Sequence, residues 1–342
     1  MPVSRRFLVL GAALATLVPA SAQTPEEVKV GLTNVSSDVG FFIADKKRYF
    51  AAEGIKLTTA TFASAAKMIA PLGTGELDVG GGTVAAGLYN AVERGINIKV
   101  VADKASVEEG YEYSTLLVSK DLADSGRYKA LADLKGMTVA TAAQGAGSES
   151  ALNEALKKGG LTFADVNVVY MGFPEMLAAM RNKGIDAGIT NEPTVTRAIE
   201  QGFAVRASKS AIYPGQQTAV VLYSDAFIKR RAVAQKFMNA YIRALRDYND
   251  ALKGGHIAGA GADEIIAILN QYTRIKDPKI YRDMTPFAAN PDGHVNKATL
   301  QNDYDFFKGR GLISGHVTVD QVIDNSFADG AVRELGPYKP KS

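Results

Sequence analysis

The chain has 342 residues, 46% of them hydrophobic and 22% charged, which is a globular rather than a fibrous or disordered composition. Its 39 Lys and Arg nearly balance its 36 Asp and Glu, so no basic surplus exists to replace the counterions of a nucleic acid. The absence of cysteine excludes cysteine nucleophiles, thiol redox chemistry, iron–sulfur clusters and Cys-ligated zinc. With three histidines and no HExxH motif, no metal site is expected.

The first 22 residues have the three parts of an export signal. Arg5 and Arg6 supply positive charge, and residues 7–18 form an apolar run too short to cross a hydrocarbon core of about 30 Å. Small residues at 20–22 suit cleavage near Ala22. We expect export by the general route, although the arginine pair resembles a twin-arginine signal with one residue missing. The mature protein is then periplasmic and not embedded in the membrane; a buried first helix is the alternative.

The next 200 residues alternate between strand-like runs and helical patterns. The runs of strand-like composition are 28–33, 55–61, 98–102, 114–119, 137–141, 166–171, 187–190 and 218–223. Between them, apolar residues recur at helical spacing, as at Val84, Leu88, Ala91 and Val92. Strand–helix alternation predicts an α/β fold with mostly parallel sheets flanked by helices.

The alternation runs in two rounds, residues 28–102 and 137–207, and a helical region follows. That region holds a long amphipathic pattern at 233–252, a glycine-rich loop at 254–261 and a shorter helix around 265–269.

Two extended crossings, near 111–115 and 215–222, separate these parts. We therefore predict a lobe 1 made of residues 23–112 and 222–342 and a lobe 2 made of residues 113–221, with the helical region covering lobe 1. Two sequential domains are the alternative.

The turns after the strands are the candidate ligand site, because ligands of open parallel sheets bind beyond the carboxyl ends of the strands. These turns are rich in Ser, Thr, Gly and Asn, which cap helices and expose N–H groups with partial positive charge, and phenylalanines lie beside them. The candidates are Ser36, Ser37, Asp38, Phe41, Phe62, Ser64, Gly82 and Thr83 in lobe 1, and Gln144, Gly145, Gly147, Ser148, Phe173, Asn191 and Glu192 in lobe 2. Any single turn is equally explained as an ordinary helix cap beside core aromatics.

Catalytic motifs are not found. Residues 145–150 lack the third glycine of a dinucleotide loop, and neither a GxxxxGK[ST] nor a GxSxG motif occurs. Residues 292–294 lack the remaining ligands of a calcium loop. Asp38, Asp103 and Glu192 could act as acid or base, but a lone carboxylate at a helix start is more often a cap. We expect a binding protein without catalytic residues or cofactors.

Ordered motifs along the mature chain resemble the periplasmic substrate-binding proteins of ABC importers for nitrate, sulfonates, taurine and related compounds. They are a loop and helix at 37–44 leading to YFAAEGI at 49–55, GELD at 75–78, DLKGMTVA at 133–140, KGIDA at 183–187, NEP at 191–193, and LI at 312–313 with VIDNSF at 322–327. Many members place a tryptophan before Glu-Pro; here Asn191 stands there and the chain has no tryptophan.

The resemblance implies a type II periplasmic binding protein. Its two lobes, joined by a two-crossing hinge, close as a monomer on one small-molecule ligand, which passes to a membrane permease driven by a cytoplasmic ATPase. It also implies the two facing sets of ligand residues named above. Related enzymes, the thiamine-pyrimidine synthases and aromatic desulfinases, depend on cysteines that this chain lacks.

We expect the ligand to be a small organic anion, a sulfonate or an aromatic carboxylate. Nitrate would need no aromatic walls, and an uncharged pyrimidine would need partners such as Asn191 and Glu192. A sensor that presents its closed form to a membrane receptor is also compatible with the sequence.

Overall fold

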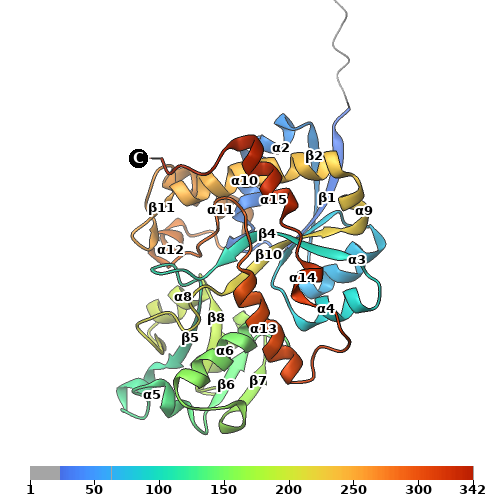
Figure 1. Ribbon diagram of the computed structural model, residues 1–342. Helices are drawn as coiled ribbons and strands as arrows, with labels where there is room; N and C mark the ends of the chain where they lie inside the picture. The colour runs from blue at the N-terminus through green and yellow to red at the C-terminus, as the bar shows by residue number, and fades with distance from the viewer. Residues whose placement is uncertain (1–23, 63, 342) are drawn as a thin grey trace, which may run out of the picture.

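The computed structural model describes residues 24–62 and 64–341 (Figure 1). The predicted signal peptide, residues 1–22, lies outside this range. Among the described residues, no helix combines the length and the apolar character needed to cross a bilayer.

The described chain forms two five-stranded sheets of identical layout. The lobe 1 sheet has the order β2-β1-β3-β10-β4, with β1 at Glu26–Leu32, β2 at Ile55–Thr61, β3 at Val79–Gly82, β10 at Gln217–Ser224 and β4 at Ile98–Ser106. The lobe 2 sheet has the order β7-β6-β8-β5-β9, with β7 at Asn167–Tyr170, β6 at Thr138–Thr141, β8 at Ala187–Asn191, β5 at Ser114–Ser119 and β9 at Ala204–Arg206. In each sheet four strands share one direction, and the strand that follows a crossing, β10 or β5, is antiparallel. The two-lobed α/β prediction is confirmed.

Helices cover both faces of each sheet, which explains why central strands such as β10 are buried along their whole length. One face of the lobe 1 sheet packs against α1 (Val39–Lys46), α10 (Arg231–Asp250), α11 (Ala262–Tyr272) and α15 (Ser326–Leu335). The other face packs against α3 (Ile69–Thr74), α4 (Ala86–Glu93), α13 (Lys297–Gly309) and α14 (Val319–Val322). In lobe 2, α6 (Gly147–Lys158) covers one face, and α7 (Phe173–Arg181) with α8 (Thr194–Glu200) covers the other.

The long helix predicted at 233–252 is α10, and its apolar stripe forms the centre of the lobe 1 core. Phe237, Tyr241 and Tyr248 recur at helical spacing and are fully buried. The Phe237 ring stacks on Phe50 with centroids 4.7 Å apart, and the Tyr241 ring lies 5.0 Å from Phe41. These aromatic contacts fix α10 against the helices that follow β1.

Three local predictions differ from the structure. Strand β4 runs four residues past the predicted end at 102, and the short strand β9 was not predicted. The loop predicted at 254–261 is wrong in part, because Leu252–Lys253 (β11) and His256–Ile257 (β12) pair as a hairpin. Its two-residue turn, Gly254 and Gly255, has φ of +59° and +80°, and glycine adopts positive φ without steric cost.

The chain crosses between the sheets twice, after β4 and after β9, and the crossings lie side by side. Val107 N–H donates to the Gln216 carbonyl at 3.0 Å, and Gly215 N–H donates to the Val107 carbonyl at 2.7 Å. The crossings therefore form one hinge.

Helix α13 is a third connection between the lobes, which the sequence did not predict. One side of α13 buries Leu300 and Phe307 in the lobe 1 core. The other side lies along α6 of lobe 2 (Figure 1), where Asp303 accepts hydrogen bonds from Ser150 and from Tyr213 at the hinge. Asp303 is 3% exposed and has no cationic partner in the described part of the chain. Burial raises the pKa of Asp303 to about 7, although the bonds from Ser150 and Tyr213 oppose the rise.

Asp303 makes stability depend on pH in a predictable direction. Its folded pKa of about 7 exceeds the unfolded value of 3.8, so between these pH values the folded state binds more protons and stability falls as pH rises. The Asp303→Asn variant keeps an oxygen that accepts both hydrogen bonds but has no charge to bury. We expect its unfolding free energy, relative to the wild type, to increase by about 1 kcal/mol or more from pH 5 to pH 8 in urea titrations. A difference that does not change with pH would contradict this.

Candidate functional site

Residues that follow strands of lobe 1 contact the crossing or lobe 2 at two places. At the first, the segment Thr83–Ala86 touches the segment Gly145–Gly147. At the second, the loop after β1 meets Tyr113, which directly precedes β5 and packs its ring in the lobe 1 core.

The first meeting place joins the N-termini of α4 and α6. Neither helix has a side-chain cap, since Ala85 and Ala146 stand at the N-cap positions. Instead, Ala86 N–H of α4 donates to the Gly145 carbonyl of lobe 2 at 2.9 Å, and Ala85 and Ala146 form an antiparallel bridge. The lobes are therefore closed onto one another by main-chain contact.

Small residues permit this contact. A Cβ on Gly145 would lie 3.0 Å from Ala86 Cβ, and a Cβ on Gly147 would lie 3.2 Å from Thr83 Cγ2. Both approaches are tighter than ordinary van der Waals contact. The predicted site residues Thr83, Gly145 and Gly147 are thus brought together, and in this closed arrangement they touch each other across the lobes.

A Gly145→Ala substitution should favour separation of the lobes. Gly145 has φ of +68°, so alanine costs about 1–2 kcal/mol there and also collides with Ala86. Gly160→Ala is the matched control, because Gly160 has φ of +70° but open space around it. We expect the radius of gyration from small-angle X-ray scattering to increase for Gly145→Ala alone. Equal radii for both variants would show that this contact does not hold the lobes together.

At the second meeting place, a buried lysine binds the loop after β1. Lys104 is 1% exposed, and its Nζ lies 2.8 Å from Ser37 Oγ and 2.9 Å from Asp38 Oδ1. Asp38 Oδ2 accepts hydrogen bonds from Thr33 N–H at 3.0 Å and from Val35 N–H at 3.2 Å. Asp38 Oδ1 thus forms the ion pair with Lys104, although it accepts no hydrogen bond from the described residues, and Asp38 Oδ2 holds the loop in place.

Two hydroxyl groups complete this cluster. Ser36 is 2% exposed, and its Oγ has no hydrogen-bond partner among the described residues. The hydroxyl of Tyr113 lies beside those of Ser36 and Ser37; burial raises the pKa of Tyr113, and the two serine hydroxyls oppose the rise. We call Ser36, Ser37, Lys104 and Tyr113 the donor cluster.

Glu192 is the buried acid of the Asn-Glu-Pro turn, and both of its carboxylate oxygens have partners within the chain. Its Oε1 lies 3.0 Å from Arg206 Nη2 and accepts from Thr285 N–H at 3.4 Å, and its Oε2 accepts from Thr196 N–H at 3.0 Å. Burial raises the pKa of Glu192, and the hydrogen bonds from Thr196 and the charge of Arg206 oppose that rise. Glu192 thus ties the end of β8 to the segment around Thr285 in the C-terminal part of the chain.

The predicted phenylalanines pack into the cores of the two lobes. Phe41 is 1% exposed and belongs to the lobe 1 core, where its ring packs on Tyr241 and Phe237. Phe62 is partly buried against the opposite core of lobe 1. Phe173 begins α7 and is partly buried in the core between α7, α8 and their sheet.

The remaining candidates are spread around the two meeting places. Ser64 and Gln144 are exposed, and Asn191 is half-buried at the end of β8. Ser148 Oγ accepts from Ala142 N–H at 3.1 Å and so stabilises its own turn. Gly82 ends β3, where a Cβ would lie 2.4 Å from Ala65 Cβ, so its lack of a side chain serves packing within lobe 1.

Two residues of the donor cluster, Lys104 and Tyr113, are not among the predicted site residues. Lys104 stands two residues after the predicted end of its strand at 102, in a segment predicted to be a turn. In the structure the pairing of β4 with β10 passes from Asp103–Val220 to Ala105–Ala219, so Lys104 is the extra residue of a β-bulge. Bulges redirect side chains, commonly beside functional sites.

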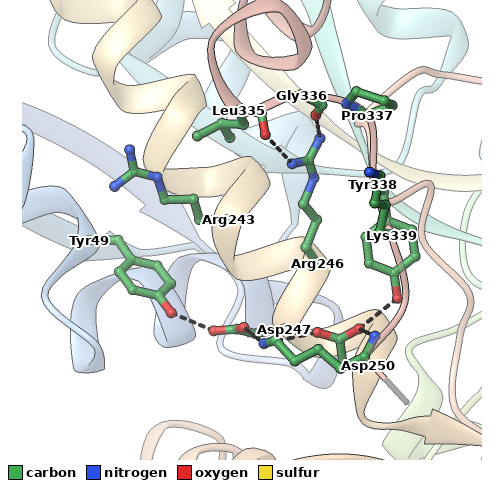
Figure 2. Close-up of a pocket in the computed structure, with 11 residues that line it drawn as sticks. Tyr49, Arg243, Arg246, Asp247, Asp250, Leu335, Gly336, Pro337, Tyr338 and Lys339 are labelled. Atoms are coloured by element: carbon green, nitrogen blue, oxygen red, sulfur yellow. Dashed lines mark hydrogen bonds and ion pairs between the residues drawn. The ribbon is translucent and has the colours of Figure 1, made fainter.

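A surface pocket of about 500 Å³ lies elsewhere, between α10 and the C-terminal segment (Figure 2). Its two aspartates are hydrogen-bonded: Tyr49 donates to Asp247 at 2.6 Å and Tyr338 donates to Asp250 at 2.8 Å, while Arg246 binds the Gly336 carbonyl (Figure 2). These contacts fasten the C-terminal segment to α10. The polar groups that line this pocket therefore serve to attach the C-terminal segment, and we do not assign the pocket as a ligand site.

Comparison with known proteins identifies the family. The model of the NMT1-like family matches residues 21–258, and the chain belongs to this family. A putative ABC transporter periplasmic binding protein of Brachyspira hyodysenteriae is 30% identical over 300 residues, which cover 82% of each chain. A putative aliphatic sulfonates-binding protein of Escherichia coli is 26% identical and covers 91% of this chain and 92% of its own. The expected resemblance to binding proteins of ABC importers, rather than to enzymes, is confirmed.

Solved structures show the same fold. The periplasmic aliphatic sulphonate binding protein SsuA of Escherichia coli matches with a TM-score of 0.69 and 20% identity, covering 89% of this chain and 99% of that one. The periplasmic nitrate-binding protein NrtA of Synechocystis PCC 6803 matches with a TM-score of 0.72 and 13% identity, covering 91% and 89%. The chain therefore has the periplasmic-binding-protein fold.

Proposed function

We propose that this protein is the periplasmic solute-binding component of an ABC importer. It captures a small organic anion, a sulfonate or an aromatic carboxylate, between its lobes and delivers it to a membrane permease. In this proposal the protein is exported, with its signal peptide cleaved near Ala22. The named relatives and the shared fold support the class of protein.

The donor cluster is the observation that supports an anionic ligand. The carboxylate oxygens nearby, on Asp38 and Glu192, already accept hydrogen bonds or ion pairs from the chain. Lysine can only donate, so when Lys104 donates to Ser37 Oγ, the Ser37 proton must point elsewhere. Ser36, Ser37 and Lys104 can each still donate a proton, and a set of buried donors suits a ligand that brings only acceptors, such as a sulfonate or carboxylate head.

The positions of these donors explain why ligand binding would close the lobes. Ser36 and Ser37 belong to lobe 1. Tyr113 lies on the first crossing, with its ring in the lobe 1 core and its carbonyl accepting from Glu192 N–H of lobe 2 at 2.8 Å. All three residues are at least 96% buried when the lobes touch. A ligand can reach them only when the lobes separate. A head group that bonds to both lobes then binds the closed state better than the open one and shifts the population towards closure.

A thermal-shift screen tests the ligand class. Ethanesulfonate and benzoate represent the proposed anions, and nitrate and uracil represent the other classes. At 100 times its dissociation constant a ligand stabilises the folded state by about 2.7 kcal/mol, which gives a clear rise in Tm. We expect a rise with sulfonates or carboxylates. A response to uracil alone, or to none of these compounds, would contradict the proposal.

Ser36→Ala tests the site itself. Because Ser36 Oγ has no partner among the described residues, alanine should leave the Tm of the ligand-free protein unchanged or slightly raised. Binding of the stabilising anion should weaken by roughly 10-fold in calorimetry, since a hydrogen bond to a charged group is lost. Ser210→Ala, at an exposed serine distant in sequence, is the control. Unchanged affinity in Ser36→Ala would remove Ser36 from the site.

A further inference from the structure

Lys104 is buried in the protein interior. Lysine side chains are almost never fully buried unless they are paired. The chain holds it there by three features. The bulge on β4 inserts Lys104 as an extra residue, Asp38 supplies the counter-charge, and Gly81 leaves room for its stem. A Cβ on Gly81 would lie only 2.8 Å from Lys104 Cε and 2.9 Å from the Phe41 ring.

The contacts of Lys104 leave part of its binding capacity free. An ammonium group has three N–H donors, and within the described residues Nζ contacts only Ser37 Oγ and Asp38 Oδ1. Asp38 Oδ2 accepts hydrogen bonds from Thr33 and Val35, so Asp38 is fixed in place beside Lys104. The remaining N–H of the ammonium group is therefore available to a ligand as a charged donor.

We propose that Lys104 determines specificity by making the site select an anionic head group over a neutral one of the same shape. This rests on the proposed function, since it concerns the same ligand. In the closed protein, Lys104 acts on the ligand in two ways: through its free N–H, and through Ser37, whose hydroxyl it polarises so that the proton points away from Lys104. A ligand without charge gains only the hydroxyl hydrogen bonds, whereas an anion also gains the attraction of the ammonium.

The test compares matched pairs of probes by calorimetry: ethanesulfonate with ethanesulfonamide, and benzoate with benzamide. The principal variant is Lys104→Gln/Asp38→Asn, which removes both charges together and so avoids leaving an unpaired buried carboxylate. Gly81→Ala is a second, independent variant that keeps the charge but displaces the Lys104 stem. Lys99→Gln is the control, because Lys99 lies on the same strand but binds the Gln321 carbonyl.

We expect the wild type and Lys99→Gln to bind an anionic probe at least 10-fold more tightly than its neutral partner. In the double variant the anion should lose roughly 10- to 100-fold in affinity while the neutral partner changes little. Gly81→Ala should change binding in the same direction.

Two other results separate the proposals. If the wild type prefers the anion and the double variant binds it equally well, the role of Lys104 is overturned and the proposed function stands. If the wild type binds neutral probes as tightly as anions, or binds none of the four, the anionic ligand class is overturned, and the role of Lys104 with it.

Discussion

The buried ion pair of Lys104 and Asp38 is the constraint on which the candidate site depends. Removing two charges from water costs several kcal/mol for each ion, and the cost is offset only where geometry is good and the remaining polar atoms are bonded. Here the pair is 2.9 Å apart, and the second oxygen of Asp38 binds the main chain of the loop after β1. Folding can therefore satisfy the pair only if that loop adopts one conformation, which presents Ser36 and Ser37 in fixed positions before any ligand arrives.

The contacts that close the lobes have a different character. Between Ala86 and Gly145 they consist of main-chain hydrogen bonding and touching small residues, without charges. The net contribution of such a hydrogen bond is about 1 kcal/mol, because water replaces it when the lobes part. A weakly held closed state suits a binding protein, since a ligand with modest differential affinity can then decide whether the lobes stay closed.

The overall fold could be predicted because it depends on repeated local patterns. Alternating strands and helices, and the mostly helical segment after Tyr223, are visible as hydrophobic periodicity, and the carboxyl ends of the strands locate the candidate site. The details of the site depend on long-range pairing, which periodicity does not contain. Lys104 lies in a predicted turn, and only the pairing with β10 and the approach of Asp38 bury it. Phe41 stands beside the polar loop in sequence, but α10 covers it with Tyr241.

Helix α13 determines on which side the two lobes separate more easily. It runs from the hinge, where Asn296 and Thr299 bind the Gly215 carbonyl, along α6 to the ends of α4 and α6. Near its far end Arg310 binds Glu149, whose side chain is fully buried and also accepts from Gly145 N–H at 2.8 Å.

Separating the lobes on the α13 side would break the ion pair of Arg310 with Glu149 and the hydrogen bond from Ser150 to Asp303. A hydrogen bond to a charged group contributes about 1.5–3 kcal/mol, more than the neutral main-chain bond between Ala86 and Gly145. The loop of Ser36 and Ser37 is held within lobe 1, by Lys104 and by main-chain groups of residues 33–35, and so can stay formed while the lobes part. Opening should therefore leave α13 packed on α6 and separate the lobes on the side away from it, so that the ligand reaches the donor cluster from that side.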